Sequence, residues 1–485
     1  MKISFELLTD AEIRQVHDAS LRVLEDTGMR FASRKVLDRL AAIGATVDFA
    51  ERTARFPPRL VEAAIAGNQE LLRKGRRLHL LNGVTSERTG TDTIRAKVSG
   101  GCEKYLDWGS RSIRAADAES LLRFIRLGDL LPEVSFVGNP VVAATGPGGS
   151  KIDERMRRIE TAALIAKNTR KPGSMEVWSE KEIDLLMEIG IIARGSREAF
   201  FEAPCLVTAK ETISPLFLDE NASDILIALA ARDLPCTIIP MPLTGMSAPA
   251  TKPGNVIVGN AEILAVITAV RAFHPHALVG GGAISGALDM KTGVASFSAP
   301  EAILQDIALA EVHGRLYGFD FLVGSGYTDA KLPNPQLVAE KTMKYLLTYL
   351  SGRASYPVGL INSGAVFSDV QCLVDIEICR YIHGHFGSFG DFSSIGEITD
   401  LVREVGIQGS YVAADHTLRH FRESWMPSIM DRTSFSSLTD SQAGDIYANA
   451  FASIQEMHSR AEFWQIDPSA ARAIDHVVRQ AERIL

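Results

Sequence analysis

From residue 134 onward the chain alternates short apolar runs with stretches of helical pattern. Seven runs are clear and the last is weaker; they begin near residues 134, 173, 204, 235, 276, 316, 356 and 386. Apolar strands separated by helices are typical of a parallel sheet that is covered on both faces. Eight such units are the number that a TIM (β/α)8 barrel needs, and we predict this α/β fold for residues 126–410.

An open, doubly wound sheet is the alternative arrangement of the same units. Its nucleotide-binding versions carry a GxGxxG turn after a strand, or a Walker A loop. The glycine-rich stretches GPGGSK (146–151) and GGGAISG (280–286) both miss the required spacing. Nucleotide binding therefore has no motif to support it, and the barrel is the preferred prediction.

The residues on either side of the predicted barrel have a helical pattern. TDAE at 9–12 forms a capping box before an amphipathic stretch, and FPPRLVEAAIAG at 56–67 predicts a helix that prolines begin and Gly67 ends. The histidine- and arginine-containing segment 409–440 is expected to lie across one end of the barrel. We therefore predict a mostly helical N-terminal region over 1–125 and a C-terminal helical segment over 411–485 that packs on the barrel.

The composition argues against several classes of protein. The 485 residues carry a formal net charge of −8 at pH 7 and no lysine- or arginine-rich run, so nucleic acid is not an expected partner. No stretch has 18 consecutive apolar residues, and the first residues carry charges where a signal peptide has its apolar region. We expect a cytoplasmic protein that does not enter membranes and whose five cysteines stay reduced.

Polar residues follow most of the predicted strands, and in a TIM barrel the active site lies at the carboxyl ends of the strands. These residues are Asn139, Glu176, Glu211, Thr244, Ser285, Asp329, Lys331, Asn362 and Ser363. A loop hydrogen bond or a helix cap is an equally good interpretation of any one of them, but several at one barrel end predict a site. No metal is expected there, because HTLRH (416–420) lacks the glutamate of HExxH and no cysteine has ligand spacing.

Aromatic residues make up only 7% of the chain, so those near predicted strand ends are informative. Tyr105 and Trp108 lie near the start of the predicted barrel, Tyr327 at the end of its sixth strand and Phe367 after its seventh. Core packing is one interpretation of these side chains. The other is a cage whose ring faces attract a quaternary ammonium ion, by about 0.5 to 2 kcal/mol per contact.

Five longer motifs occur in order along most of the chain: LLTDAEIRQVHDASLRVLEDTGMRF, SGGCEKYLDW with RSIRAAD after it, MSAPATKPGNVIVGNAEILA, GSGYTDAKLPNPQ and DHTLRHFRESWMPSIMDR. Together they resemble the trimethylamine methyltransferase family, in the branch that lacks pyrrolysine and includes glycine betaine corrinoid methyltransferases. The resemblance implies a TIM barrel, a methylated amine as substrate, and the Co(I) corrinoid (cobalamin) of a separate small corrinoid-binding protein as methyl acceptor. Pyrrolysine is expected in or near GSGYTDAKLPNPQ, where this chain has only standard residues, which argues against trimethylamine as the substrate.

A quaternary nitrogen is already positively charged, so a nucleophile can displace its methyl group without an acid that protonates the leaving amine. We therefore predict a corrinoid-dependent methyltransferase that removes water from a quaternary amine or betaine and aligns one N-methyl bond with the cobalt. Asp329 and Lys331 are the predicted catalytic pair, with Asp329 toward the ammonium and Lys331 toward the carboxylate; a mutual salt bridge that fixes the loop is the alternative. Further substrate contacts are predicted for Tyr105, Trp108, Glu211, Tyr327, Asn362, Phe367 and His416.

Two other functions fit the same pattern. One is a quaternary-amine demethylase with another methyl acceptor, such as a folate or a thiol. The other is a non-catalytic protein that binds or senses quaternary amines. We also expect a homo-oligomer, because apolar barrel helices often pair.

Overall fold

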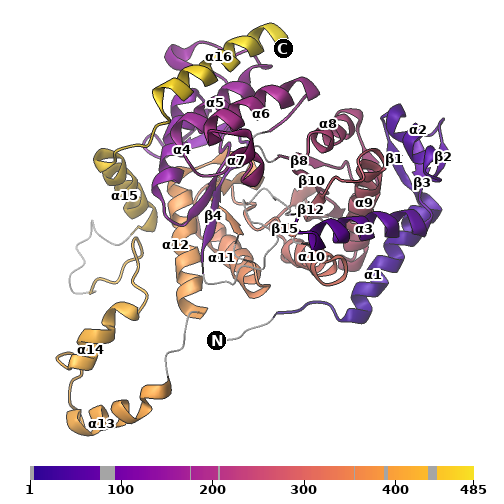
Figure 1. Ribbon diagram of the computed structural model, residues 1–485. Helices are drawn as coiled ribbons and strands as arrows, with labels where there is room; N and C mark the ends of the chain where they lie inside the picture. The colour runs from indigo at the N-terminus through magenta and orange to yellow at the C-terminus, as the bar shows by residue number, and fades with distance from the viewer. Residues whose placement is uncertain are drawn as a thin grey trace.

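The structure is a computed structural model that describes residues 5–76, 93–174, 176–205, 208–319, 321–353, 355–386, 392–434 and 445–485. Within these ranges the chain is a mixed α/β protein whose helices surround parallel strands (Figure 1). The predicted α/β class is therefore confirmed.

Two parallel sheets form the centre of the fold, with the strand orders β15-β12-β10-β8 and β16-β4-β7. The strands are β4 (Arg95–Val98), β7 (Val134–Val137), β8 (Thr208–Glu211), β10 (Cys236–Ile239), β12 (Val279–Ala283), β15 (Phe321–Val323) and β16 (Ser355–Pro357). A hydrogen bond from Val137 N to Pro172 O, 2.8 Å long, and the close approach of Gly173 to Val137 and of Ser174 to Gly138 place residues 172–174 beside β7 as a further segment. Among the described residues, strand hydrogen bonds do not join the two sheets into one closed ring.

Each of these eight segments is followed by a helix before the next segment begins. The helices are α4 (Ala118–Leu130), α5 (Arg157–Asn168), α6 (Glu180–Arg194), α8 (Glu220–Ala231), α9 (Lys252–Phe273), α10 (Pro300–Glu311), α11 (Pro335–Leu350) and α12 (Asp369–Phe386). A shorter helix, α7 (Arg197–Glu202), follows α6. The repeated strand–helix order is the one that the sequence predicts.

The first strand of this series lies earlier than the sequence predicts. β4 is inside the region 1–125 that was expected to be mostly helical, because its sequence RAKV has a lysine at its centre and no continuous apolar run. The weakest predicted run, near residue 386, is not described as a strand: residues 387–391 lie outside the described ranges, and α13 (Ile395–Val405) follows. The predicted number of units is therefore found with a shift of one unit toward the N-terminus.

Loops at the carboxyl ends of the strands form two small sheets. One has the order β11-β13-β14 and the other β17-β18-β5-β6. Their strands are β11 (Leu243–Thr244), β13 (Gly286–Asp289), β14 (Val294–Ser296), β5 (Lys104–Asp107), β6 (Ser112–Ala115), β17 (Leu360–Ile361) and β18 (Val366–Phe367). These loops therefore add ordered structure around the end of the parallel strands where the site lies.

The N-terminal region combines helices with a small sheet. It contains α1 (Asp10–Arg22), α2 (Arg34–Ala42), α3 (Pro58–Arg73) and the strands β1 (Met29–Phe31), β2 (Thr46–Asp48) and β3 (Thr53–Arg55), and β9 (Phe217–Leu218) joins this sheet at β1. The predicted capping box at the start of α1 is confirmed, since Thr9 and Glu12 exchange side chain to backbone hydrogen bonds. Gly67 does not end α3; the absence of a Cβ there makes room for the guanidinium of Arg271.

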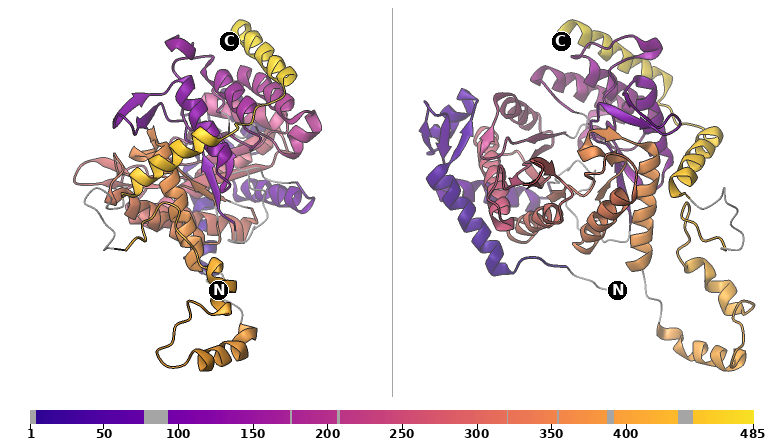
Figure 2. Two further views of the ribbon diagram at one scale, coloured as in Figure 1. Left: turned by 90° about the vertical axis from the view of Figure 1, so that its left-hand side faces the viewer. Right: turned by 180° about the vertical axis from the view of Figure 1, so that it is seen from behind.

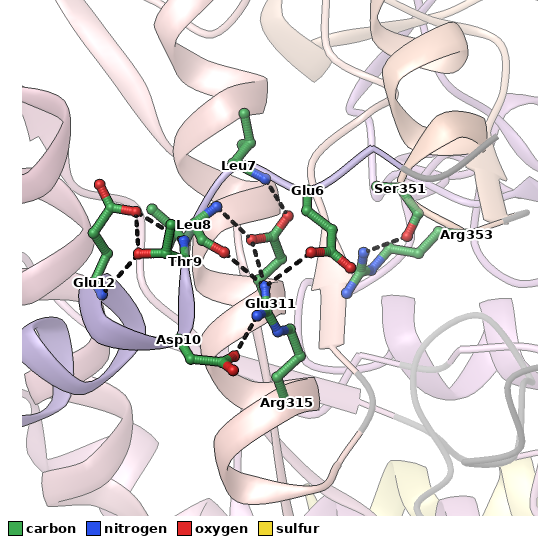
Figure 3. Close-up of polar contacts among 10 residues, drawn as sticks. All are labelled: Glu6, Leu7, Leu8, Thr9, Asp10, Glu12, Glu311, Arg315, Ser351 and Arg353. Atoms are coloured by element: carbon green, nitrogen blue, oxygen red, sulfur yellow. Dashed lines mark hydrogen bonds and ion pairs between the residues drawn. The ribbon is translucent and has the colours of Figure 1, made fainter.

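The segment before α1 is anchored by a buried carboxylate of α10 (Figure 3). Glu311 accepts hydrogen bonds from the backbone N–H groups of Leu7 at 2.7 Å and Leu8 at 2.9 Å. Arg315 donates to the carbonyl oxygen of Leu8 at 2.7 Å and also pairs with Asp10. These contacts attach the chain start to the helical layer around the strands.

Helix α9 is mostly apolar around its circumference, with a few buried polar side chains such as Glu262. Its length and hydropathy would allow it to cross a membrane, but 78% of its most apolar window is buried inside the protein. It packs against α1, α3 and α10. This burial is that of a core helix. Among the described residues, α9 is the one helix that is long and apolar enough to cross a membrane.

The C-terminal part divides into a packed and a projecting portion. α15 (Ile446–Arg460) packs on α12, and α16 (Pro468–Ile484) packs on α5 and α6. In contrast, α13 and α14 (Asp415–His420) stand away from the rest of the molecule in all three views (Figures 1 and 2). The expectation that segment 409–440 crosses one end of the barrel is therefore wrong for α14.

Candidate active site at the carboxyl ends of the strands

A cavity of about 430 Å³ opens at the carboxyl ends of the parallel strands. Each of the eight strand segments, or the residues directly after it, contributes to the lining. The lining residues that matter below are Lys97, Ser99, Asn139, Ser174, Glu176, Trp178, Lys210, Glu211, Asp219, Asn221, Ile239, Ile284, Leu322, Tyr327 and Pro357. The site that the sequence predicts at this end of the fold thus has a matching cavity.

Lys97 lies deep in this cavity. It is the third residue of β4, its neighbours in register are Phe136 and Pro357, and it is only 9% exposed. Burial lowers the pKa of Lys97 to about 8, because the apolar surroundings disfavour the charged form. The amine therefore still carries its proton at neutral pH.

Acidic side chains line the outer part of the cavity. Glu176 is half-buried and Glu211, the last residue of β8, is exposed. Even so, the surrounding walls remove enough water from Glu211 to raise the pKa of its carboxyl group, and Lys210 offsets part of this effect. Burial likewise lowers the pKa of Lys210, with Glu211 opposing the change. The mouth therefore offers negative charge with reduced hydration.

Two aromatic rings stand next to these carboxylates. Trp178 donates a hydrogen bond from its indole nitrogen to the Glu176 carboxylate at 3.1 Å. The Arg158 guanidinium lies over the indole ring of Trp178, 4.7 Å from the ring centroid. Tyr327 lines the cavity from the loop after β15. Burial raises the pKa of its hydroxyl, and the nearby charges of Glu211 and Glu176 raise it further, so this ring stays neutral.

Two buried charged side chains, Asp306 and Lys344, hold the loop that carries Tyr327 and the backbone next to it. The carboxylate of Asp306 on α10 accepts backbone N–H groups from Ser285 at 2.8 Å and Gly324 at 2.9 Å. Lys344 on α11 donates to the carbonyl oxygens of Phe297 at 2.7 Å and Tyr327 at 3.1 Å. Burial raises the pKa of Asp306 to about 7 and lowers the pKa of Lys344 to about 8. These groups bind backbone rather than face the cavity, so they position the wall.

The loop after β8 is held in a similar way by Glu262 of α9. Its buried carboxylate accepts hydrogen bonds from Thr212, from Ser214 at 2.9 Å and from the Leu216 backbone at 2.8 Å. Glu211 immediately precedes this loop. A helix behind the sheet therefore orients the acidic side of the cavity.

The predicted catalytic pair does not line the cavity. Asp329 accepts hydrogen bonds from the Ser296 hydroxyl and, at 3.0 Å, from the Phe297 backbone, so its carboxylate ties the β14 end to the loop. Lys331 is exposed. No ion pair joins the two among the described residues, so the alternative of a mutual salt bridge is not formed either. The catalytic role of Asp329 and Lys331 stays a prediction, and their positions outside the cavity lining do not support it.

Of the other seven predicted contacts, only Glu211 and Tyr327 line the cavity. Tyr105 and Phe367 are buried in the core, where each packs against Phe124 with ring centroids 5.7 and 4.8 Å apart. Trp108 packs against the Arg111 guanidinium and the ring of Tyr447. The positions of these three aromatic side chains agree with the core-packing interpretation rather than with a cation cage.

Two further predicted contacts lie elsewhere. Asn362 has a positive φ of 50° in a tight turn, where its backbone N–H donates to Ala330 O at 2.9 Å. His416 is on the projecting α14, with its ring 4.4 Å from that of His420. The structure therefore does not bring either residue to the cavity.

Sequence reasoning missed Lys97, Trp178 and Lys210. Lys97 was hidden because β4 was not recognised as a strand. Trp178 and Lys210 adjoin strand-end residues that were identified, Glu176 and Glu211, and an inspection of one or two positions around each strand end would have found them. Strand-end position was thus a better guide than the motif in the 327–331 loop.

The described residues contain no group of three or more histidine, cysteine, aspartate or glutamate side chains that could hold a metal ion. What the cavity does offer is the buried ammonium of Lys97 at its floor, the carboxylates of Glu176 and Glu211 toward its mouth with Lys210 beside them, and two aromatic rings. Such an arrangement can bind an organic cation at the mouth. It has the groups to position a substrate with charges of both signs.

Comparison with known proteins shows similarity along nearly the whole chain. The family model for trimethylamine methyltransferase (MTTB) matches residues 2–484. A trimethylamine methyltransferase of Desulfitobacterium hafniense (strain DSM 10664 / DCB-2) is 25% identical, over 88% of this chain and 84% of that protein. A glycine betaine methyltransferase of D. hafniense (strain Y51) is 24% identical, over 89% of this chain and 88% of that protein.

A third relative is a proline betaine:corrinoid methyltransferase of Eubacterium limosum, 26% identical over 87% of this chain and 86% of that protein. Among solved structures, the monomethylamine methyltransferase of Methanosarcina barkeri aligns with 99% of this chain and 88% of its own, at 13% identity and a TM-score of 0.48. The match of the family model over nearly every residue decides the assignment. The chain belongs to the trimethylamine methyltransferase family.

Proposed function

We propose that this protein transfers a methyl group from a quaternary amine to the Co(I) corrinoid of a small partner protein. The observation that carries the proposal is the cavity mouth, where Glu176, Glu211, Trp178 and Tyr327 stand together. Carboxylates and ring faces are the groups that attract a methylated ammonium ion. Two relatives are named as methyltransferases of betaines, and one of these names a corrinoid as well.

Methyl transfer from a quaternary amine requires the protein mainly to position the substrate. The corrinoid acceptor supplies the nucleophile: an electron pair of Co(I) forms the new bond to the methyl carbon, and the C–N bond breaks with its electrons going to nitrogen. The leaving group is a neutral tertiary amine, so no proton has to be delivered. Glu176 and Glu211 hold the cation, and the aromatic rings exclude water and limit its rotation, which aligns one N-methyl bond with the opening.

The same proposal includes the arrangement that this reaction needs around the site. The eight strand segments, from β4 to β16, form a (β/α)8 barrel that begins within the predicted N-terminal region 1–125. The predicted C-terminal segment 411–485 lies outside this barrel. The corrinoid protein approaches the carboxyl ends of the strands, where the cavity opens. The protein acts in the cytoplasm and forms a homo-oligomer.

A direct test is methyl transfer with purified components. The protein is mixed with glycine betaine, with and without chemically reduced Co(I) cobalamin, and dimethylglycine is measured by mass spectrometry. We expect product only when Co(I) is present. Equal product in both mixtures would show that another acceptor is used, and no product with any quaternary amine would support the sensing function instead.

The choice between quaternary and tertiary amines sharpens this test. Neutral trimethylamine would have to expel an amide anion, a much poorer leaving group than a tertiary amine. We therefore expect the best betaine to be demethylated at least about tenfold faster than trimethylamine, which corresponds to about 1.4 kcal/mol in the barrier. Equal rates for both substrates would mean that the site activates tertiary amines as well.

A further inference from the structure

Lys97 points into the cavity from the floor of the site. The residue after it, Val98, and its neighbour Val137 on β7 both pack against Gly128 of α4, so these two side chains face the helical layer. Because successive side chains of a strand point to opposite faces, Lys97 faces the interior that the strands enclose. Its place among the lining residues agrees with this direction.

The ammonium group of Lys97 has no acidic partner in the described part of the chain. No hydrogen bond or ion pair joins it to another described residue, and its nitrogen lies 6.0 Å from the centroid of the Phe136 ring. Other buried lysines of the protein do have partners: Lys341 pairs with Asp375 at 2.8 Å, and Lys344 donates to two carbonyl oxygens. A buried cation without a counter-charge is costly unless a ligand supplies one.

The acidic side chains of the cavity lie near Lys210 and not near Lys97, since Glu211 and Glu176 both act on the pKa of Lys210 and neither acts on that of Lys97. Lys97 is 9% exposed at the floor, whereas Glu176 is half-buried and Glu211 is exposed toward the mouth. Only burial shifts the pKa of Lys97, while both carboxylates act on Tyr327. The acidic groups therefore belong to the side of Tyr327, and they do not neutralise the lysine.

We propose that Lys97 binds the carboxylate of a zwitterionic substrate, so that the substrate enters with its anionic end first and leaves its methylated nitrogen near Glu176, Glu211, Trp178 and Tyr327. This inference rests on the methyl transfer proposed above and adds the class of substrate. A charged hydrogen bond from the ammonium to the carboxylate replaces the missing counter-charge. In this orientation the N-methyl groups lie on the side of the cavity opening, from which the corrinoid approaches.

The same lysine selects against substrates that carry only positive charge. A simple tetraalkylammonium ion, or protonated trimethylamine, would fill the mouth and leave Lys97 buried with a like charge above it. Specificity then comes from repulsion of the wrong substrate as well as attraction of the right one. Lys97 is therefore a specificity-determining residue rather than a group that takes part in breaking the C–N bond.

Equilibrium binding of two probes tests this inference without relying on catalysis. Titration calorimetry is carried out with glycine betaine and with tetramethylammonium, for the wild type and for Lys97→Met. We expect the substitution to weaken betaine binding by about tenfold or more, the loss typical of a hydrogen bond between charged groups, and to leave tetramethylammonium binding unchanged or tighter. Proline betaine serves as a second carboxylate-bearing probe.

Lys104→Met is the matched control, because Lys104 is an exposed residue of β5 that does not line the cavity. It should leave binding of both probes unchanged, and thermal unfolding of all variants checks that they are folded. Equal loss for both probes in Lys97→Met, or no loss for betaine, would overturn the inference. The inference would also be overturned if the wild type bound tetramethylammonium but bound neither glycine betaine nor proline betaine.

The methyl-transfer assay separates this inference from the proposed function. If betaine binding depends on Lys97 but Co(I) cobalamin accepts no methyl group, the inference holds and the methyltransferase function fails. If methyl groups are transferred equally well from betaine and tetramethylammonium, and Lys97→Met changes neither rate, the function holds and the inference fails.

Discussion

Two buried lysines, Lys341 and Lys97, differ in whether an acidic side chain neutralises their charge. Lys341 and Asp375 are both 0% exposed and form an ion pair of 2.8 Å, and the same carboxylate accepts the backbone N–H of Gly359 at 2.8 Å. Lys97 is nearly as buried but faces the cavity without an acid. The two sites are linked in space, because Pro357 is the register neighbour of Lys97 and its carbonyl oxygen accepts the Tyr345 hydroxyl at 2.6 Å.

The difference shows that burial alone does not tell what a lysine does. Lys341 is part of a closed network of donors and acceptors that holds the loop after β16, so its charge is used within the protein. Lys97 has the same chemistry and lacks that network. A charge that the protein itself leaves unpaired, at the floor of a cavity, is available to a ligand.

The largest effect is expected from removal of the paired lysine. Lys341→Met leaves the Asp375 carboxylate buried without a cation, which should lower the free energy of unfolding by about 3 to 5 kcal/mol. Chemical denaturation at pH 7 measures this value. The double variant Lys341→Met/Asp375→Leu should recover most of the loss, because it removes both charges. A single variant as stable as the wild type would remove the distinction between the two lysines.

A change of opposite sign is expected at the unpaired lysine. Lys97→Met should raise the free energy of unfolding at neutral pH by roughly 3 kcal/mol, since the shift of its pKa from 10.5 to about 8 is the cost of burying the charge. Chemical denaturation of both proteins at pH 7 gives the difference. A variant that is less stable than the wild type would indicate that an unrecognised partner stabilises Lys97.

The pH dependence of this gain follows from the same shift. Between about pH 8 and pH 10.5 the unfolded chain keeps the Lys97 proton that the folded protein has lost, so stability due to this group rises with pH over that range. Lys97→Met lacks this increment, and the two proteins should therefore converge in stability as the pH rises. The difference between them is the correct measure, because burial lowers the pKa of Lys344 as well.

The smallest effects are expected in the loop whose charged pair the sequence suggested. Asp329→Ala leaves the Ser296 hydroxyl and the Phe297 N–H without their acceptor, and should cost about 1 to 2 kcal/mol of stability. Lys331→Ala changes an exposed residue and should alter stability by less than about 0.5 kcal/mol. Denaturation and turnover are measured on both variants. If both variants kept their stability and lost tenfold or more of their turnover, the result would support Asp329 and Lys331 as the catalytic pair that the sequence predicts.

Local signals in the sequence were sufficient for much of the architecture. The capping box at Thr9 and Glu12, the alternation of strands and helices, and the polar residues at strand ends all depend on neighbours within a few positions. Asn139, Glu176 and Glu211 were identified in this way, and all three line the cavity. Capping and strand periodicity are properties of short segments, which is why a single sequence reveals them.

The tertiary structure decided which of those residues meet and what each one faces. Glu211 ends β8 and Asp329 lies in the loop after β15. The carboxylate of Asp329 is bound by Ser296 and Phe297, 33 and 32 positions earlier, whereas Glu211 lines the cavity. Lys97 could not be identified from RAKV, because its place at the cavity depends on the direction of one side chain and on register with β7 and β16, whose residues lie far away in the sequence. The sequence by itself determined the repeating units and the end of the fold at which the site lies. Long-range pairing alone determined that an unpaired lysine stands at its floor.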